Sequence, residues 1–173
     1  RTCAGKSTIF KLLMGLYEPQ QGEVRIEGVP ASAIPDEARR GLFGYVEQTF
    51  HRVPGTVRDQ ITLFDASIAD GAVQNAAKLA GLDETIRALP NGYDTPCTPE
   101  LFSQGQWQLL AIARAAAANP KLLLLDEITA NLDVETENQV IEALKCVSVD
   151  RTVISISHRT NARTGRVIPI SAQ

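Results

Sequence analysis

The chain begins with RTCAGKST over residues 1–8, and this segment is the strongest indication of how the chain folds. A Gly-Lys-Ser-Thr run that leads into an amphipathic segment is typical of a loop that binds phosphates. The free backbone N–H groups of such a loop lie at the positive end of the following helix dipole, where they bind anionic oxygens. Lys6 can contact the β- and γ-phosphates of a nucleotide, and the Ser7 hydroxyl can bind the accompanying Mg²⁺. The complete pattern G-x-x-x-x-G-K-[ST] requires a glycine before Arg1, so the rest of the chain has to support this interpretation.

Length and composition indicate one globular domain. The chain has 173 residues, of which 44% are hydrophobic and 21% charged, enough for a single hydrophobic core but short for two. The formal net charge of -3 offers no attraction to nucleic acid, so no nucleic-acid partner is expected. The cysteines Cys3, Cys97 and Cys146 lie far apart and are expected to be reduced thiols. The sequence contains no apolar run of roughly 18 residues, so any action at a membrane would require a partner that spans it.

Apolar periodicity predicts helices that alternate with strands. Helices are expected over residues 7–17, 56–63, 69–80, 83–88, 104–119 and 134–147, with a short helical turn over 36–40. Strands are expected over residues 22–28, 42–46, 122–125, 152–156 and 167–170. The runs at 122–125 and 152–156 are typical of strands buried on both faces, as in parallel sheets. The alternation therefore predicts an α/β fold with a mostly parallel sheet flanked by helices.

Residues 49–119 differ in character from the rest of the chain. Breakers such as PG at 54–55 and PNG at 90–92 separate short helical patterns there. We expect a helical subdomain over about 49–119, inserted within one domain into an α/β core formed by residues 1–48 and 120–173.

Polar residues follow three of the predicted strands. Gln48 follows one strand, the pair Asp126-Glu127 follows another, and His158 follows a third. In open parallel sheets, ligands bind outside the carboxyl ends of the strands, so these side chains are expected to converge on one crevice. Asp126 can bind Mg²⁺, often through water, and Glu127 can polarise an attacking water as a general base. The alternatives are a loop or helix-cap carboxylate for Asp126 and an ordinary strand-end histidine for His158; His51 is expected to lie outside any site.

Further motifs complete a resemblance to the nucleotide-binding domain of ABC transporter ATPases, which are P-loop NTPases. The segment LFSQGQ at 101–106 resembles the signature motif of that family, L-S-G-G-Q, directly before a predicted helix. Gln48 is at the Q-loop position, and Asp126-Glu127 matches the Walker B motif. The segment ANLD at 130–133 resembles the D-loop, S-A-L-D, and His158 matches the switch histidine. The order of these motifs along the chain makes a chance match negligible.

The resemblance implies ATP and Mg²⁺ as cofactors. The residues expected to bind the nucleotide are Cys3, Ala4, Gly5, Lys6, Ser7, Thr8, Gln48, Ser103, Gly105, Gln106 and Asp126. The residues expected to bind the metal are Ser7, Gln48 and Asp126. Glu127 would be the catalytic base, His158 would contact the γ-phosphate, and Lys6 would stabilise the developing charge.

The resemblance also implies partners. Two such domains would pair head to tail, as a homodimer or a heterodimer, with the signature helix of one domain facing the ATP of the other. A transmembrane domain of the transporter would hold the pair peripherally at the cytoplasmic side of the cell membrane. Asp133 would lie at the dimer seam or would be the N-cap of the helix that follows it, and both roles can hold.

The segment PGTVRDQI at 54–61 resembles the P-G-T-[IV]-x-[ED]-N-I stretch of exporter-type members, which favours ATP hydrolysis that powers export. The alternatives are an ABC-type ATPase that does not act in transport and a nucleotide-binding module with impaired turnover. The incomplete Walker A motif motivates the second alternative, as does Cys3, which stands where the family usually has a glycine. Phe102 and Gln104 also depart from the usual signature. We expect the chain to be a fragment of a longer protein, without the N-terminal strands of the domain.

Overall fold

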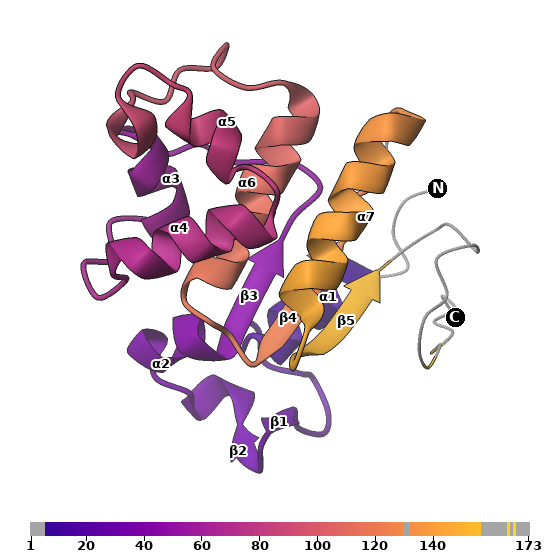
Figure 1. The fold of residues 1–173 in the computed structure, drawn as a ribbon. Coiled ribbons are helices and arrows are strands. Elements are labelled where there is room, and N and C mark those ends of the chain that lie inside the picture. The colour runs from indigo at the N-terminus through magenta and orange to yellow at the C-terminus, as the bar shows by residue number, and fades with distance from the viewer. Residues whose placement is uncertain (1–5, 130–131, 157–165, 167, 169–173) are drawn as a thin grey trace.

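The computed structural model describes residues 6–129, 132–156, 166 and 168, with only the backbone for Lys6 and Ser7 (Figure 1). The elements in chain order are α1 (Lys6–Leu13), β1 (Arg25–Ile26), β2 (Val29–Pro30), η1 (Ala31–Ala33), α2 (Asp36–Leu42), β3 (Phe43–Val46), α3 (Val57–Thr62), α4 (Asp70–Leu79), α5 (Asp83–Arg87), η2 (Gly92–Asp94), α6 (Gln104–Ala117), β4 (Leu122–Asp126), α7 (Val134–Ser148) and β5 (Thr152–Ile156). Among these helices, none has the length and apolar character needed to span a bilayer. The predicted α/β class is confirmed.

The central sheet is parallel, with the strand order β3-β4-β5. Val46 lies opposite Leu125, and Asp126 lies opposite Ile156, so the carboxyl ends of all three strands lie at one edge of the sheet. The four leucines of β4 are all buried, because this strand has a neighbour on each side and helices on both faces. The predicted central strand is therefore confirmed.

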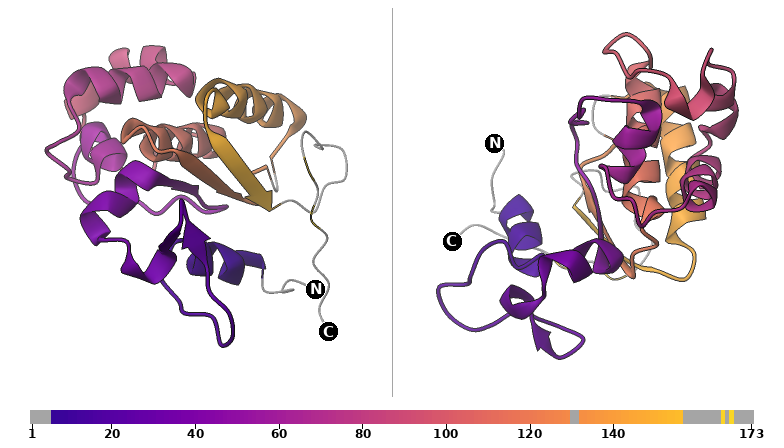
Figure 2. Two further views of the ribbon diagram at one scale, coloured as in Figure 1. Left: turned by 90° about the horizontal axis from the view of Figure 1, so that it is seen from below. Right: turned by 90° about the vertical axis from the view of Figure 1, so that its left-hand side faces the viewer.

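Helices cover both faces of this sheet. On one face, α1 packs through Phe10 on the even-numbered leucines of β4, Leu122 and Leu124. On the other face, residues of α6 and α7 share a core cluster with Leu123 and Leu125. Figure 2 shows α1 on one side of the sheet and the pair α6 and α7 on the other. The sheet is thus the middle of three layers.

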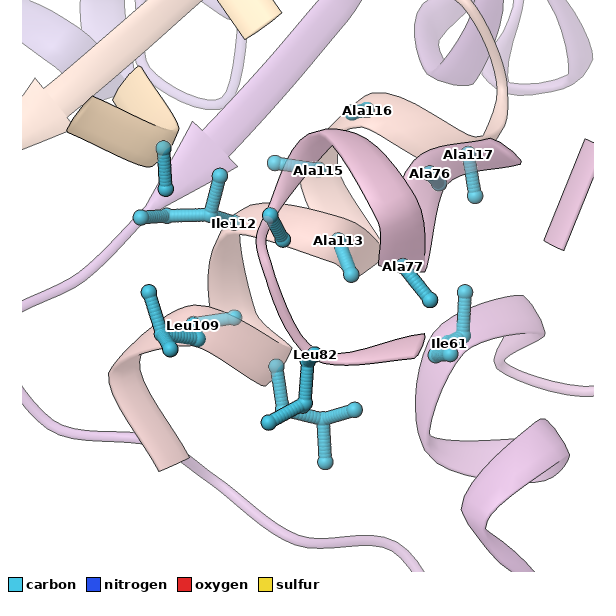
Figure 3. Packing of buried hydrophobic residues seen from close by; sticks show 14 of the residues in the cluster. Ile61, Ala76, Ala77, Leu82, Leu109, Ile112, Ala113, Ala115, Ala116 and Ala117 are labelled. Atoms are coloured by element: carbon cyan, nitrogen blue, oxygen red, sulfur yellow. The ribbon is translucent and has the colours of Figure 1, made fainter. Parts of the chain in front are cut away.

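The helices between β3 and β4 pack through small side chains. Figure 3 shows Ala76 and Ala77 of α4 beside the alanines of α6. Small side chains such as alanine let two helix backbones approach closely. The resulting cluster continues to Val46 and Leu123 of the sheet, so the helical part and the sheet share one core. Helices are present in this region where the sequence predicts them, while the boundaries of a helical subdomain stay a prediction.

The expectation of one strand over residues 22–28 is wrong, because β1 and β2 form a separate antiparallel hairpin. Ile26 lies opposite Val29, which leaves Glu27 and Gly28 as a two-residue turn with φ of 50° and 83°. Positive φ at both central residues is what a type I′ turn requires, and glycine adopts it readily. The alternating pattern indicated extended backbone but did not reveal this reversal of the chain.

Two helix boundaries also differ from the expected ones. The first helix ends at Leu13 instead of near residue 17. Gly15 has φ of 68°, in the left-handed region, so the backbone leaves the helical direction there. A Cβ at this position would lie 2.1 Å from the carbonyl oxygen of Ala31 in η1, so only glycine fits this close approach. The helical turn expected over 36–40 extends to Leu42, which therefore belongs to α2 and not to the strand that follows.

The expectation that β5 is buried on both faces is wrong. Val153 and Ile154 are 38% and 37% exposed. Within the described part of the chain, β5 pairs with β4 alone and lies at the edge of the sheet. The strand expected over 167–170 falls, except for Ile168, outside the described residues.

Candidate active site

Three of the predicted site residues stand at the ends of strands that finish at the same edge of the sheet. Asp126 is the last residue of β4, and Glu127 follows it directly. Gln48 comes two residues after the end of β3, which is in register with β4. The crevice that the sequence predicts at the ends of the strands stays a prediction. His158 lies outside the described residues.

Asp126 contacts a tyrosine that the sequence did not single out. Because side chains alternate along a strand, Asp126 lies on the α1 face of the sheet. There the hydroxyl of Tyr45 donates a hydrogen bond to Asp126 Oδ2 at 3.3 Å. The Tyr45 ring meets Phe10 of α1 edge on, with ring centroids 6.0 Å apart. Tyr45 therefore connects α1, β3 and the carboxylate at the end of β4.

The environment of Tyr45 keeps its phenol protonated. Burial and the adjacent charge of Asp126 raise the pKa of Tyr45 above its ordinary value. The hydroxyl thus stays a hydrogen-bond donor to the carboxylate over the physiological pH range. The sequence contained one sign of this contact, because the Tyr45 hydroxyl is the polar side-chain group of the otherwise apolar strand β3.

At Glu127, directly after the end of β4, the backbone departs from the extended conformation of the strand. The φ of Glu127 is 51°, in the left-handed region that residues other than glycine seldom adopt. Its backbone N–H donates a hydrogen bond to the carbonyl of Ile156 at 3.0 Å, which holds the turn against β5. The change in backbone direction allows the two half-buried carboxylates to have separate roles.

The helix α1 forms the start of the candidate phosphate site. It begins at Lys6, as expected for a helix that follows a phosphate loop, and Thr8 is exposed on its first turn. The predicted residues that lie outside the described ones, or that are described by backbone alone, are Cys3, Ala4, Gly5, Lys6 and Ser7.

The segment 101–106 begins α6 with a capping box. Ser103 Oγ accepts a hydrogen bond from the Gln106 N–H at 3.3 Å, and Gln106 Oε1 accepts one from the Ser103 N–H at 2.9 Å. This reciprocal pair fixes the first turn of the helix. Ser103 is exposed, and its hydroxyl, which accepts here, retains a proton that it can donate. Phe102, a departure from the usual signature, is buried and meets Trp107 edge on at 5.2 Å.

The first turns of α6 and α7 meet. Asp133 caps α7, because its Oδ1 accepts from the Thr136 N–H at 3.0 Å and its Oδ2 accepts from the Thr136 hydroxyl at 2.7 Å. These hydrogen bonds lower the pKa of Asp133. Gly105 of α6 packs directly on Thr136. The N-cap role expected for Asp133 is confirmed, and its place at a dimer seam stays a prediction.

The loop that follows β3 runs along α6. Gln48 is exposed, and its carbonyl accepts a hydrogen bond from Gln108 Nε2. Phe50 stacks on Trp107 with ring centroids 5.2 Å apart and an interplanar angle of 28°. A cavity of about 220 Å³ between loop and helix is lined by Gln48, Thr49, Phe50, Arg52, Gln104, Trp107 and Gln108. The sequence did not predict these contacts, which join residues up to 60 positions apart.

A second cavity, of about 280 Å³, lies beside the same loop. Its charged or titratable lining residues include Arg40, Glu47, His51 and Arg114. His51 Nε2 lies 3.2 Å from Glu47 Oε2. Burial, and then the nearby charge of Arg40, lower the pKa of Arg114 to about 10, so this guanidinium stays charged at neutral pH. That His51 lies outside the site stays a prediction.

The donor atoms expected at the site fit Mg²⁺. Ser7, Gln48 and Asp126 offer hydroxyl, amide and carboxylate oxygens, which are the hard donors that magnesium prefers. Among the described residues, no group of three or more His, Cys, Asp and Glu side chains could hold a metal ion. Magnesium in phosphoryl-transfer sites is usually held by one or two carboxylates together with substrate phosphates. These residues therefore fit a metal that binds together with a nucleotide.

Comparisons with known proteins agree with this geometry. A family profile described as "ABC transporter" matches residues 1–130. The "Uncharacterized ABC transporter ATP-binding protein YfiC" of Bacillus subtilis (strain 168) is 41% identical over 162 residues, which are 92% of this chain and 27% of that protein. The "ABC multidrug transporter MDR2" of Trichophyton tonsurans (strain CBS 112818) is 40% identical over 174 residues, which are 96% of this chain and 13% of that protein.

A solved structure has the same fold. The match is to "Structure of a bacterial Atm1-family ABC exporter with ATP bound", with a TM-score of 0.76 and 36% sequence identity. The matched region covers 90% of this chain and 28% of that exporter chain. The chain thus spans between 13% and 28% of the length of these relatives.

Proposed function

The chain belongs to the ABC transporter family, and we propose that it binds and hydrolyses ATP as the nucleotide-binding domain of an exporter. Its fold is that of a P-loop NTPase, as the sequence predicts. The observation that carries the proposal is the end of β4, where the backbone turns at Glu127 directly after Asp126, at the sheet edge where β3 ends two residues before Gln48. The names of the relatives, an ATP-binding protein, a multidrug transporter and an exporter, support transport over an ATPase without a transport role.

The phosphate loop and the sheet edge would share the binding of the nucleotide. Backbone N–H groups at the start of α1 and the Lys6 ammonium would bind the phosphates. Ser7 and Gln48 would bind Mg²⁺ directly, and Asp126 would bind it through water, its carboxylate oriented by the Tyr45 hydroxyl. When bound, Mg²⁺ neutralises negative charge on the phosphate oxygens.

Hydrolysis would require a water molecule placed in line with the bond to the γ-phosphate. Glu127, turned away from Asp126 by its backbone conformation, would orient this water and accept its proton. Lys6 and His158 would stabilise the negative charge that develops on the γ-phosphate oxygens.

The capping box of α6 favours a role in a second nucleotide site. Ser103 is exposed at the helix N-terminus and retains a proton to donate, while Gly105 and Gln106 hold the first turn of the helix. A hydroxyl and a helix N-terminus together suit a phosphate. We infer that this surface binds the ATP of a second nucleotide-binding domain, paired head to tail, and that both domains dock peripherally on a transmembrane domain at the cytoplasmic side of the membrane.

The test of this function is the substitution Glu127→Gln, which keeps the shape of the side chain and removes its basicity. We expect ATP binding and ATP-driven dimerisation to persist and the rate of hydrolysis to fall by about 100-fold or more. The matched control is Glu135→Gln, at an exposed position on the first turn of α7, which should hydrolyse ATP like the parent. Hydrolysis by Glu127→Gln near the parent rate would show that Glu127 is not the base.

A further inference from the structure

Gln108 holds the loop that contains Gln48. It lies in the second turn of α6 and is 6% exposed, and its Nε2 donates a hydrogen bond to the Gln48 carbonyl at 2.5 Å. The neighbouring residue Trp107 stacks on Phe50, two positions after Gln48. Two adjacent residues of α6, Trp107 and Gln108, thus contact the loop residues on either side of Thr49.

Folding stability alone does not explain an amide at this buried position. Gln108 Oε1 is buried and has no hydrogen-bond partner among the described residues. A buried polar atom without a partner costs free energy that is comparable to or larger than the net gain from one hydrogen bond. A leucine at position 108 would fill similar space without that cost. The hydrogen bond to Gln48 is therefore what this amide supplies.

We propose that Gln108 is a positioning residue for Gln48. Gln48 is exposed two residues beyond the end of β3, so burial does not fix the direction of its side chain. Fixing its carbonyl fixes the backbone at this residue and so the direction in which its side chain leaves the chain. The inference rests on the proposed function, in which Gln48 binds the Mg²⁺ that accompanies ATP. Gln108 then acts on the metal through Gln48, without touching it.

The experiment measures how much Mg²⁺ strengthens nucleotide binding. The dissociation constant of a non-hydrolysable ATP analogue is determined by equilibrium dialysis, once with Mg²⁺ and once with EDTA, and the ratio of the two values is compared between variants. Gln108→Leu should reduce this ratio about threefold to tenfold and leave the constant in EDTA unchanged. Gln108→Met, another uncharged side chain of similar length without the donor, should behave alike and serves if the leucine variant does not fold.

Gln60 provides a matched control. It is also a fully buried glutamine that holds the same loop, since its Nε2 donates to the Val53 carbonyl at 2.8 Å and its Oε1 accepts from the Val53 N–H at 2.9 Å. Gln60→Leu should lower the thermal stability of the protein but leave the Mg²⁺ ratio at the parent value. An equal loss of nucleotide affinity with and without Mg²⁺ in Gln108→Leu would overturn the proposal, because it would indicate a structural role only.

Gln48→Ala separates this inference from the proposed function. If Gln108 acts through Gln48, Gln48→Ala lowers the ratio and adding Gln108→Leu lowers it no further. If Gln48→Ala lowers the ratio while Gln108→Leu retains the parent value, the positioning role is wrong and the metal role of Gln48 stands. If Gln48→Ala leaves the ratio unchanged, the metal role of Gln48 is wrong and the role of Gln108 falls with it.

Discussion

A Cβ added to Gly105 would lie 2.3 Å from Thr136 Cγ2, so the signature segment at the start of α6 packs directly against the first turn of α7. The backbone N–H and the hydroxyl of Thr136 both donate hydrogen bonds to the carboxylate of the cap residue Asp133. The two helix starts therefore share one contact, and a side chain at position 105 would disturb both.

We expect Gly105→Ala to destabilise the protein by about 1–3 kcal/mol, the usual effect of overpacking a tight contact. Thr136→Ser should relieve the clash, because it removes the Cγ2 methyl while the remaining Oγ1 and Cβ atoms lie 3.4 and 3.5 Å from the added Cβ. Urea denaturation of both single variants and of the double variant measures the coupling between the two positions. Strictly additive losses would contradict the contact. Gly71→Ala in α4, where a Cβ would meet nothing within 4 Å, is the control and should be neutral or slightly stabilising.

We expect Ser103→Ala to have two effects that a matched variant separates. Thr56 forms a capping box of the same kind at α3, with its hydroxyl accepting from the Asp59 N–H at 3.3 Å. Both Ser103→Ala and Thr56→Ala should lower the free energy of unfolding by about 0.5–2 kcal/mol. Only Ser103→Ala should also weaken ATP-driven dimerisation, measured by light scattering in the Glu127→Gln background. Equal dimerisation by the two variants would limit Ser103 to its capping role.

We expect Tyr45→Phe to cost about 0.5–1.5 kcal/mol of folding stability at neutral pH, through loss of the hydrogen bond to Asp126. The folded-state pKa of Tyr45 is raised, so the hydroxyl contributes fully below the ordinary tyrosine pKa of about 10 and loses this contribution as the pH rises through the folded-state pKa. Urea denaturation of parent and variant at about pH 8 and about pH 11 should therefore give a smaller difference at the higher pH. A difference that is constant over this range would contradict the burial of the phenol beside the carboxylate.

We expect two residues opposite each other in the sheet to differ in their contribution to stability. Leu124 of β4 is fully buried, whereas Ile154, its partner in the register of β5, is 37% exposed. Leu124→Ala should cost about 2–5 kcal/mol, and Ile154→Ala at most about half as much, because less buried surface is lost. Thermal or urea denaturation of both variants measures the difference, and equal costs would place β5 inside the core.

Much of the fold was predictable because its signals are local. The four leucines of β4 indicated a central parallel strand, and the helix periodicities gave most boundaries within two residues. The capping residues Ser103 and Asp133 stand directly before the helices that they cap, so a short window of sequence contains the whole interaction. The hairpin at Glu27-Gly28 was missed, because the alternating pattern of a strand does not report where the chain reverses.

Local sequence patterns were enough to predict the α/β class and the order of the motifs, and they indicate residues 1–8 as a candidate phosphate loop. The folded structure was needed to find that Tyr45 contacts Asp126, that Gln108 binds the Gln48 carbonyl and that Gly105 packs on Thr136. Within the described residues, the fold also places β5 at an exposed edge of the sheet. These contacts join residues far apart in the chain, and both burial and hydrogen bonding depend on neighbours that lie outside any local sequence pattern.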